Sequence, residues 1–344
     1  MRHALDNTVD GIDVETAMRA ALELARPTRP HPNPRVGAVI VDPHGAVVAQ
    51  GAHTGPGNPH AEVEALGDRS FGGHTMVVTL EPCNHTGRTP PCTEAIIASG
   101  IERVVVGAVD PDHRVAGQGI ERLRSAGIEV TTGVLADEVE RTDRAYFHHR
   151  RTGRAFVTLK MASTLDGQAA AADGTSQWIT GASARRDAHR TRSEHDAVLV
   201  GAGTYLTDHP DLSVRDIEYE GPQPLPVVVA GRRAVHLSDD HRRRGGIVIR
   251  SGPVADPLHI ARELPASGLL SVLVEGGPTL ARSFLDAGLV DEIHWYLGAL
   301  LGGGTGTPAL GGRFDTLADA VELRIERIEV LDGDLKVVAE VRSR

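Results

Sequence analysis

The sequence contains few aromatic residues, only two cysteines and no long hydrophobic segment. No apolar run reaches the ~18 residues that a membrane-spanning helix needs, so we expect no membrane partner. The first residues lack a basic segment followed by an apolar one, which argues against a secretory signal and predicts a cytoplasmic protein. In that compartment the two cysteines, Cys83 and Cys92, are expected to be reduced metal ligands and not a disulfide.

The chain also lacks a long run of basic residues. Its formal net charge is −10, whereas a protein that binds duplex nucleic acid usually presents a stripe of lysine and arginine. We therefore expect no nucleic-acid partner. A small phosphorylated substrate remains compatible with this charge, because it needs only a few local cations.

The length of 344 residues and the apolar pattern indicate two α/β domains. In the first half the pattern predicts helices at 14–25, 61–68, 91–99 and 117–126, and strands at 36–41, 46–51, 75–80, 104–109 and 128–131. Asp13 is the expected N-cap of the first helix. A helical stretch over 136–154 becomes basic toward its end, and we place the domain boundary between residues 151 and 152.

The second half begins with a strand and repeats the alternation of strands and helices. The pattern predicts strands at 156–162, 197–200, 226–229, 247–250, 271–274 and 292–297, helices at 182–194 and 278–287, and a hairpin over 323–341. The hairpin rests on the Asp-Gly pair at 332–333. No Gly-x-Gly-x-x-Gly follows the first strand of this half, so a Rossmann-type dinucleotide site is not supported.

Four residues of the first half have the spacing of a catalytic zinc site. His60, Cys83 and Cys92 supply one imidazole and two thiols, and three protein ligands leave the fourth tetrahedral position open. Zinc lowers the pKa of a bound water to about 7, and a nearby group must then carry the protons. Glu62 lies two residues after the histidine and is the predicted general acid/base. His-x-Glu followed by two cysteines is the signature of nucleobase deaminases.

The spacing of the cysteines departs from that signature, because eight residues and not two separate them. Pro90 and Pro91 place Cys92 at the start of a predicted helix, where the helix dipole favours a thiolate. Alternatives are a binding module with structural zinc, which needs a fourth protein ligand, and two inert buried cysteines. The other histidines of this half are expected mostly at the surface, with His85 as a candidate for the substrate pocket.

The segment TLEPCNHTGRTPPC at 79–92 is the most specific motif of the chain. Further motifs are HPNPRVGAVIV at 31–41, HAEVEAL at 60–66, DPDHRVAGQG at 110–119, STLDG at 163–167, SQWIT at 176–180, DHPDLSVR at 208–215 and EGGPTL at 275–280. Together they resemble the bifunctional deaminase–reductase family of riboflavin biosynthesis, over nearly the whole chain. The long loop between the cysteines is unlike that of cytidine and transfer-RNA adenosine deaminases, and a polynucleotide deaminase is the weakest alternative.

The resemblance implies two activities on two folds. A cytidine-deaminase-like three-layer α/β/α domain over 1–151 would hydrolyse the 2-amino group of 2,5-diamino-6-(5-phosphoribosylamino)pyrimidin-4(3H)-one, giving 5-amino-6-(5-phosphoribosylamino)uracil. A dihydrofolate-reductase-like α/β domain over 152–344 would use NADPH to reduce the ribosyl group to ribityl. The implied cofactors are Zn²⁺ and NADPH, the implied partners are pyrimidine ribosyl phosphates, and we expect a homo-oligomer.

The resemblance also assigns residues in the second half. Its substrate positions are Ser176, Arg192, Leu212, Arg215 and Glu275. Its NADPH positions are Ala162, Trp178, Thr204, Asp208, Gly277, Pro278, Thr279, Leu280, Ala281, Arg282 and Ser283. The last seven open a predicted helix after a strand, where free backbone amides bind anions. Each arginine presents a planar fork of donors that suits a sugar phosphate.

Several of these residues have simpler interpretations. Arg192 fits the solvated face of a charged helix, and Trp178 fits core packing. Asp166 fits an Asp-Gly turn, since such pairs commonly form one. Lys160 lies in an apolar strand and points either at a phosphate or at solvent.

One departure from the family pattern follows strand 226–229. The family often has an Asp-Ser pair there, in which the serine contacts NADPH, whereas this chain has Ala230-Gly231. A backbone amide is a possible substitute for the serine. The departure leaves open an alternative in which the protein is a deaminase only and its reductase-like second domain is inactive.

Overall fold

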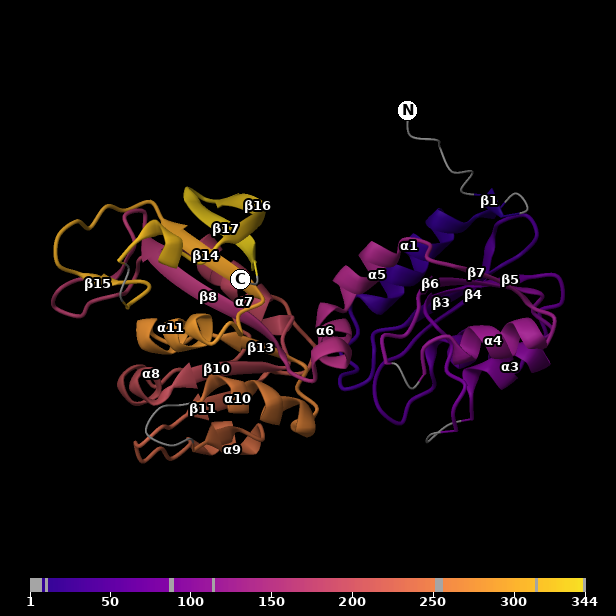
Figure 1. Cartoon of the computed structure of the whole chain (residues 1–344), viewed down its shortest axis with the longest axis horizontal. Coiled ribbons are helices and arrows are strands. Elements are labelled where there is room, and N and C mark those ends of the chain that lie inside the picture. The colour runs from indigo at the N-terminus through magenta and orange to yellow at the C-terminus, as the bar shows by residue number, and fades with distance from the viewer. Residues whose placement is uncertain are drawn as a thin grey trace. The chain divides into compact units, whose positions relative to one another are not determined.

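The computed structural model describes residues 8–9, 12–86, 90–112, 115–250, 256–312 and 315–342. The chain forms two compact units, Met1–Gly153 and Arg154–Arg344 (Figure 1). Each unit has its own mixed sheet with helices packed against it. Among the described residues, no helix combines the length and the apolar character needed to cross a membrane.

The first unit is built on a five-stranded sheet of order β4-β3-β5-β6-β7. Its strands are β3 (Gly37–Val41), β4 (Val47–Ala52), β5 (Thr75–Leu80), β6 (Arg103–Ala108) and β7 (Glu129–Thr132), preceded by a separate small pair, β1 (Thr8–Val9) and β2 (Ile12–Asp13). β3 is antiparallel to β4 and β5, whereas β5, β6 and β7 are parallel. Every residue of β3 and β5 is buried, which explains their nearly continuous apolar runs.

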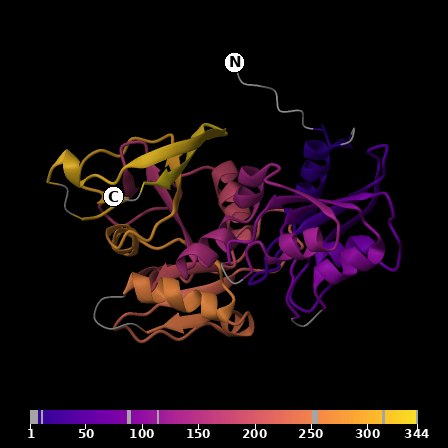
Figure 2. The ribbon, with the colours of Figure 1, turned by 45° about the vertical axis from the view of Figure 1, so that its right-hand side comes forward.

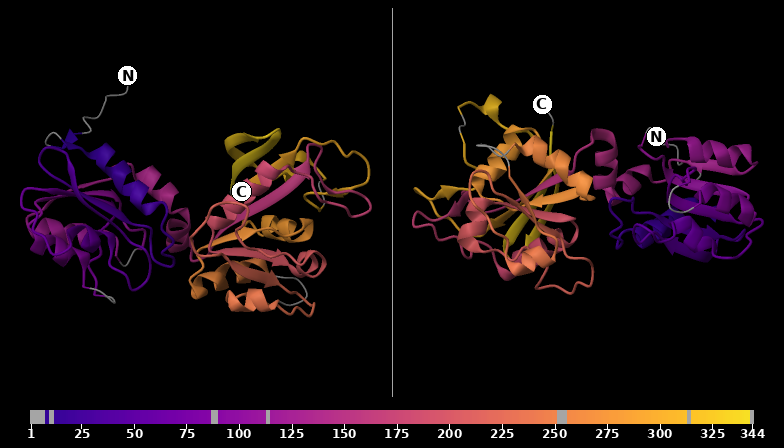
Figure 3. Two further views of the ribbon diagram at one scale, coloured as in Figure 1. Left: turned by 180° about the vertical axis from the view of Figure 1, so that it is seen from behind. Right: turned by 90° about the horizontal axis from the view of Figure 1, so that it is seen from below.

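Helices cover both faces of this sheet, which gives three layers (Figure 3). α1 (Val14–Ala25) and α5 (Ala136–Thr142) lie on one face, and α2 (Ala61–Leu66), α3 (Cys92–Ser99) and α4 (Gln118–Ser125) lie on the other. The predicted α/β/α fold is confirmed. Asp13 caps α1 as expected, because its carboxylate accepts the N–H of Thr16 at 3.1 Å.

The predicted continuous helix over 136–154 is wrong. The backbone leaves the helical region at Asp143, and a separate helix, α6 (Arg144–Thr152), follows. The cause is a distant contact. The buried Asp143 carboxylate accepts the N–H of Arg35 at 2.7 Å and lies 2.9 Å from Nε2 of His31. This residue therefore ties the end of the unit to the loop that precedes β3.

The second unit is built on an eight-stranded sheet of order β12-β11-β10-β13-β8-β14-β17-β16. Its strands are β8 (Phe156–Thr164), β10 (Ala197–Gly201), β11 (Leu225–Val229), β12 (Ile247–Ile249), β13 (Ser271–Val274), β14 (Glu292–Gly298), β16 (Leu323–Leu331) and β17 (Asp334–Val341). The first six in spatial order are parallel, and β14, β17 and β16 are antiparallel. The predicted hairpin is confirmed as β16 and β17.

The helices of this unit are α7 (Ala182–Ser193), α8 (Ala202–Asp208), α9 (Asp239–Arg243), α10 (Pro257–Glu263) and α11 (Pro278–Asp286), with short 3₁₀ turns η1 (Leu264–Ser267) and η2 (Leu317–Asp319). A small pair, β9 (Gln168–Ala170) and β15 (Thr307–Pro308), stands apart from the main sheet. The prediction omitted β9, β15 and α8 to α10, because seven residues or fewer are too short for a clear apolar period. α10 and α11 pack on one core, whereas α7 contacts β17.

Gly51 of β4 lies directly against α2, the helix that follows His60. An ideal Cβ on Gly51 would lie 2.4 Å from the carbonyl oxygen of Ala61 and 2.6 Å from the nitrogen of Ala65. We expect Gly51→Ala to destabilise the first unit by about 1–3 kcal/mol, because α2 must move away from the sheet. Thermal unfolding of the full chain measures this. Gly72→Ala is the control, because nothing lies within 4 Å of its added Cβ; equal unfolding temperatures would contradict the prediction.

Candidate active sites

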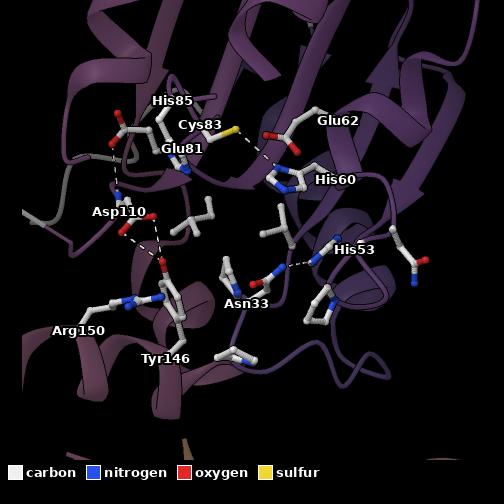
Figure 4. Close-up of a pocket in the computed structure, with 17 residues that line it drawn as sticks. Asn33, His53, His60, Glu62, Glu81, Cys83, His85, Asp110, Tyr146 and Arg150 are labelled. Atoms are coloured by element: carbon white, nitrogen blue, oxygen red, sulfur yellow. Dashed lines mark hydrogen bonds between the residues drawn. The ribbon is translucent and has the colours of Figure 1, made fainter. Parts of the chain in front are cut away.

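Three side chains of the first unit, those of His60, Cys83 and Cys92, bring one ring nitrogen and two sulfur atoms together. Figure 4 shows two of them, His60 and Cys83. Nδ1 of His60 lies 3.1 Å from Sγ of Cys92 and 3.6 Å from Sγ of Cys83, and the two sulfur atoms are 3.4 Å apart. All three atoms lie within 4.8 Å of one another. This donor set and spacing fit one tetrahedral zinc ion, whose bonds to nitrogen and sulfur are about 2.0–2.3 Å. Within the described residues the group has three members, which leaves one coordination position open.

Each of these side chains stands at the boundary of a secondary-structure element. His60 is the N-cap of α2, Cys83 follows the end of β5, and Cys92 is the first residue of α3. The backbone N–H of Cys92 points at Sγ of Cys83, 3.4 Å away. Helix starts carry unpaired N–H groups that favour negative charge, so the local backbone supports thiolate ligands.

The two thiols divide their charge unevenly. The hydrogen bond with Cys92, followed by that with His60, holds the pKa of the Cys83 thiol far below its usual range. The same contact, together with burial, raises the pKa of the Cys92 thiol. Cys83 is therefore the thiolate of the pair and Cys92 its proton donor. A divalent cation would displace that proton and convert both sulfur atoms into ligands.

Glu62 stands in the first turn of α2 and lines the same cavity as His60 and Cys83 (Figure 4). Only 3% of its surface is exposed. Burial raises the pKa of the Glu62 carboxyl to about 7. A group with a pKa near neutrality both accepts and releases a proton readily. The fold thus places a carboxyl group with a pKa near neutrality in the same cavity as His60 and Cys83.

The cavity has a volume of about 510 Å³, within the usual range for small-molecule sites. Polar side chains that the sequence analysis did not select also line it: Asn33, His53, Glu81, Asp110, Tyr146 and Arg150. His85 lines it as well, as expected. The expectation that the other histidines lie at the surface is wrong for His53, which is buried, and for His31, whose side chain is 3% exposed.

Two hydrogen-bond networks fix the walls of this cavity. Asn33 donates from its amide to Nε2 of His53 at 2.9 Å, and Nδ1 of His53 donates to the carbonyl of Pro59 at 2.9 Å, directly before His60. On the other side, the Tyr146 hydroxyl donates to Asp110 at 3.1 Å. Asn33 falls in a motif noted from the sequence, whereas no sequence signal marks Tyr146.

Glu81, which directly follows β5, also lines the cavity and holds its wall through backbone hydrogen bonds. Its buried carboxylate accepts the backbone N–H groups of Gly117 and Gly119, both at 2.9 Å. An ideal Cβ on Gly119 would lie 1.9 Å from the carbonyl oxygen of Pro82, so only glycine allows this approach. Glu81 therefore pins the start of α4 to the loop that carries Cys83.

The second unit contains a buried ion pair next to its sheet. Arg192 of α7 donates from Nε and Nη2 to the two carboxylate oxygens of Glu275, at 2.6 and 3.0 Å. Its Nη1 donates to the carbonyl of Ser213 at 2.8 Å. Burial alone would raise the pKa of Glu275, but the charge and hydrogen bonds of Arg192, aided by Lys160, outweigh it and lower the pKa to about 2. Glu275 is therefore a fixed carboxylate.

Comparison with known proteins gives a family match for each of the two units. Residues 12–108 match the family model described as the cytidine and deoxycytidylate deaminase zinc-binding region, and residues 155–337 match the RibD C-terminal domain. The riboflavin biosynthesis protein RibD of Mycobacterium tuberculosis is 41% identical over 334 residues, which covers 94% of this chain and 96% of the relative. That of Escherichia coli K12 is 37% identical over 360 residues, covering 93% of this chain and 97% of the relative.

Solved structures extend the similarity to the whole fold. The structure of RibD from Acinetobacter baumannii has a TM-score of 0.87 at 32% identity. The structure of a diaminohydroxyphosphoribosylaminopyrimidine deaminase/5-amino-6-(5-phosphoribosylamino)uracil reductase from Thermotoga maritima has a TM-score of 0.87 at 35% identity. Each match covers 96% of this chain and 99% of the solved chain. This chain belongs to the RibD family. Both the deaminase and the reductase domain of a bifunctional RibD are present, which confirms the predicted enzyme class with zinc and NADPH as cofactors.

The position of Arg192 in this RibD chain excludes the interpretation as a solvated helix face. Its side chain is 12% exposed, and all three guanidinium nitrogens bond to the protein. Arg192 holds Glu275, and none of its guanidinium nitrogens is left to bind a phosphate. Arg215 is different: it is half exposed, and its contacts with Asp211 and Asp216 are 3.8 Å long.

The predicted NADPH segment forms the start of α11. The side chains of Leu280 and Ala281 lie in the core, and Ser283 bonds to the carbonyl of Leu280 at 2.8 Å. Arg282 pairs with Asp286 at 2.7 Å. At the helix start, Gly277 and Pro278 are half-buried and Thr279 is exposed. Thr204 of α8 lies beside it, because an ideal Cβ on Gly277 would lie 3.6 Å from the Thr204 hydroxyl oxygen.

Ser176 and Trp178 line another cavity, of about 430 Å³, together with Gly302 and Gly303. Trp178 is 65% exposed, so its interpretation as core packing is wrong. The Arg185 guanidinium lies 4.2 Å from the centroid of the Trp178 ring. Asp166 does more than form a turn: it accepts the N–H groups of Gly302 and Gly303, at 3.1 and 2.5 Å.

The other predicted positions are spread over three elements. Ala162 lies in β8 opposite Tyr296, and Asp208 is the last residue of α8. Leu212 is buried with a positive φ of 57°, and so shapes the loop between α8 and β11. Lys160 does not point freely at solvent, since its ammonium lies 5.8 Å from the Tyr296 ring and interacts with Glu275.

The Arg192–Glu275 pair predicts a pH-dependent stability. The pKa of Glu275, about 2, is below its ordinary value of 4.5, so the stabilisation is complete above pH 4.5 and is lost as the pH falls toward 2. We expect Arg192→Met to cost on the order of 3 kcal/mol at pH 7, and the difference from the parent to shrink over this window.

Both tryptophans, Trp178 and Trp295, lie in the second unit, so denaturant unfolding followed by tryptophan fluorescence reports on this unit. Arg190→Met is the control, because Arg190 is on the exposed side of the same helix. A destabilisation by Arg192→Met that stayed constant from pH 7 to pH 3 would contradict the assignment.

Proposed function

We propose that the first unit deaminates 2,5-diamino-6-(5-phosphoribosylamino)pyrimidin-4(3H)-one and that the second reduces the ribosyl group of the product with NADPH. The Thermotoga maritima relative is named for a diaminohydroxyphosphoribosylaminopyrimidine deaminase and a 5-amino-6-(5-phosphoribosylamino)uracil reductase. The observation that carries the proposal is the three-member donor set with Glu62 in the same cavity. A structural zinc site would be closed by a fourth ligand.

In the first unit, His60, Cys83 and Cys92 would hold zinc, which would supply an activated water. Glu62 would carry protons between the attacking water and the departing amine. Its burial serves this role, because a carboxyl with a pKa near 7 is not a permanent anion. The net reaction replaces the exocyclic amino group by oxygen and releases ammonia.

The cavity walls recognise the rest of the substrate. Asn33, His85 and Asp110 present donors and acceptors to the edge of a pyrimidine ring. Arg150, whose guanidinium lies 4.8 Å from the centroid of the Tyr146 ring, supplies a cation for the ribosyl phosphate. With these roles an acidic chain binds an anionic substrate, because Arg150 places a positive charge next to the phosphate.

In the second unit, NADPH supplies the reducing equivalent. Glu275 is held rigid by Arg192 and faces the ribosyl group, and Arg215 binds the phosphate because its own carboxylate contacts are long. Ser176 and Leu212 complete the substrate side. The main chain at 277–283 binds the cofactor's phosphates, with Ala162, Trp178, Thr204 and Asp208 as further contacts.

Basic side chains cluster near Ala230-Gly231, where the chain departs from the family pattern. β11 and β12 are adjacent parallel strands, and Arg232, Arg233 and Arg250 follow their carboxyl ends. All three are exposed, and among the described residues no hydrogen bond or ion pair engages their side chains. The Arg233 guanidinium lies beside Gly203, next to Thr204. We infer that these arginines take the place of the family's serine and bind the 2′-phosphate that distinguishes NADPH from NADH.

The two activities are assigned to residues 1–151 and 152–344. We also infer a cytoplasmic homo-oligomer, which is compatible with two free cysteines used as metal ligands. The alternative of an inactive second unit rests on the Ala230-Gly231 departure. The ordered Arg192–Glu275 pair and the three free arginines favour an active one.

The first experiment supplies the diaminopyrimidine ribosyl phosphate to the zinc-loaded protein, with and without NADPH, and identifies the products by mass. We expect the deaminated compound without NADPH and its ribityl form with NADPH. Glu62→Gln should retain zinc and lose deamination by a factor of a hundred or more, which is about the share of a general acid/base. It should still reduce the deaminated compound when that is supplied directly.

Each outcome separates the hypotheses. Deamination by Glu62→Gln at the parent's rate would reject the proton carrier. Failure of the folded parent protein to oxidise NADPH with the deaminated compound would establish the deaminase-only alternative.

The arginines at β11 and β12 predict a shift in cofactor preference. We expect Arg233→Ala to weaken NADP⁺ binding about ten- to hundredfold and to leave NAD⁺ binding nearly unchanged, because a charge-assisted hydrogen bond contributes ~1.5–3 kcal/mol. Calorimetric titration with each nucleotide measures this without turnover. Arg262→Ala on α10 is the control; equal losses for both nucleotides would show that Arg233 does not bind the 2′-phosphate.

A further inference from the structure

Asp143 is buried between two elements that line the cavity of the first unit. It stands between α5 and α6, which are consecutive but separate helices (Figure 2). Its carboxylate accepts the N–H of Arg35 at 2.7 Å and lies 2.9 Å from Nε2 of His31. Asp143 is 4% exposed and does not itself line the cavity. Any part that it takes in the site is therefore indirect.

The two contacts of this carboxylate hold both ends of one cavity wall. This wall is the Asn33 loop, residues 31–35, in which His31 and Arg35 are the first and last residues and the three between them line the cavity. Asn33, in the middle of the loop, donates to Nε2 of His53 at 2.9 Å. The loop is thus fixed at its ends by one carboxylate and at its centre by one imidazole.

A second wall of the cavity belongs to α6. Asp143 is the N-cap of this helix, and Tyr146 and Arg150 follow it by three and seven positions, on the same helix face. Both line the cavity, and Figure 4 shows them around it together with Asn33. The side chains of Tyr146 and Phe147 are buried, so packing holds α6 independently of Asp143. The Asn33 loop is therefore the wall whose position depends on this residue.

The charge of Asp143 strengthens its hold on the loop. Burial alone would raise the pKa of the Asp143 carboxyl, but the charges and hydrogen bonds of His31 and Arg35 outweigh it and hold the pKa below its ordinary value. Hydrogen bonds to an ionised acceptor are stronger than those to a neutral one. Opening either contact would leave a buried charge with less compensation, so the loop stays closed against α6.

We propose that Asp143 is a positioning residue for deamination, which holds the Asn33 loop against α6 and so places Asn33 for its contact with the pyrimidine edge. This inference rests on the deamination proposed above for the first unit. Asp143 acts on substrate binding and not on the proton transfer at Glu62, which α2 carries. A residue with this role changes KM, whereas one that acts in the chemical step changes kcat.

Steady-state deamination of the diaminopyrimidine ribosyl phosphate by the full zinc-loaded chain tests the proposal. We expect Asp143→Ala to raise KM about tenfold and to change kcat less than about threefold, because the bound substrate loses roughly one hydrogen bond. Asp143→Asn should keep KM within about threefold of the parent, since its amide accepts the N–H of Arg35 and donates to Nε2 of His31. Glu140→Ala, which breaks an exposed ion pair with Arg151 between α5 and α6, is the control and should keep the parent KM.

A double-mutant cycle separates positioning of Asn33 from a general loosening of the fold. In an Asn33→Ala background, Asp143→Ala should raise KM less than about twofold, because both changes remove the same contact with the substrate. If Asp143→Ala does not fold, His31→Ala takes its place in the cycle with the same expectation. Two single effects that multiply, or a rise of KM in Asp143→Asn or Glu140→Ala equal to that in Asp143→Ala, would overturn the proposal.

Hydrogen exchange gives a readout that needs no turnover. The peptide covering residues 31–35 should exchange at least about tenfold faster in Asp143→Ala, because the N–H of Arg35 loses its acceptor, and at the parent rate in Asp143→Asn. Unchanged exchange in Asp143→Ala would overturn the proposal, and faster exchange with an unchanged KM would reject the role in substrate binding. A parent that shows the expected exchange but does not deaminate would reject the proposed function and not the hold of Asp143 on the loop.

Discussion

The end of a buried strand is a place where a charged side chain is held at low cost, because it leaves the apolar core there and meets free N–H groups or a cation. β5 ends at Leu80, and Glu81 and Cys83 follow it directly. β13 ends at Val274, and Glu275 follows. Backbone N–H groups stabilise the Glu81 carboxylate, and the Arg192 guanidinium stabilises the Glu275 carboxylate. The chemistry of each unit is collected at the carboxyl ends of its parallel strands.

This constraint explains which parts of the sites were predictable. His60, Glu62 and Cys92 lie at helix starts and Cys83 follows a strand, and prolines and apolar spacing mark these boundaries in the local sequence, so the cluster could be predicted from the spacing. Glu81 was not selected, because its partners Gly117 and Gly119 lie 36 and 38 residues further along the chain. Asp143 breaks the predicted helix for the same reason: its contact with the N–H of Arg35 spans 108 residues. Contacts of this length depend on the sheet order, which local patterns do not contain.

The arginines show a related limit. A sequence gives the type of side chain but not which carboxylate engages it. The sequence analysis assigned Arg192 to a phosphate. In the structure all three of its guanidinium nitrogens donate to the protein, two of them to the buried Glu275 carboxylate, which Arg192 thereby orients. Arg233 was not assigned any role, yet it is exposed beside Gly203 with no carboxylate bound among the described residues. Whether an arginine binds a ligand or positions another residue is decided by the acid nearest to it in space.

The β16–β17 hairpin and the reductase site are connected through α7. Lys336 of β17 donates to Asp187 of this helix at 2.6 Å, and the Tyr296 hydroxyl of β14 donates to the same carboxylate at 2.8 Å. All three side chains are buried, so breaking either contact would leave a charged or polar group without compensation. Arg192, which holds Glu275, lies five residues further along α7. α7 therefore joins the β16–β17 hairpin to Arg192 and, through Arg192, to the Glu275 carboxylate.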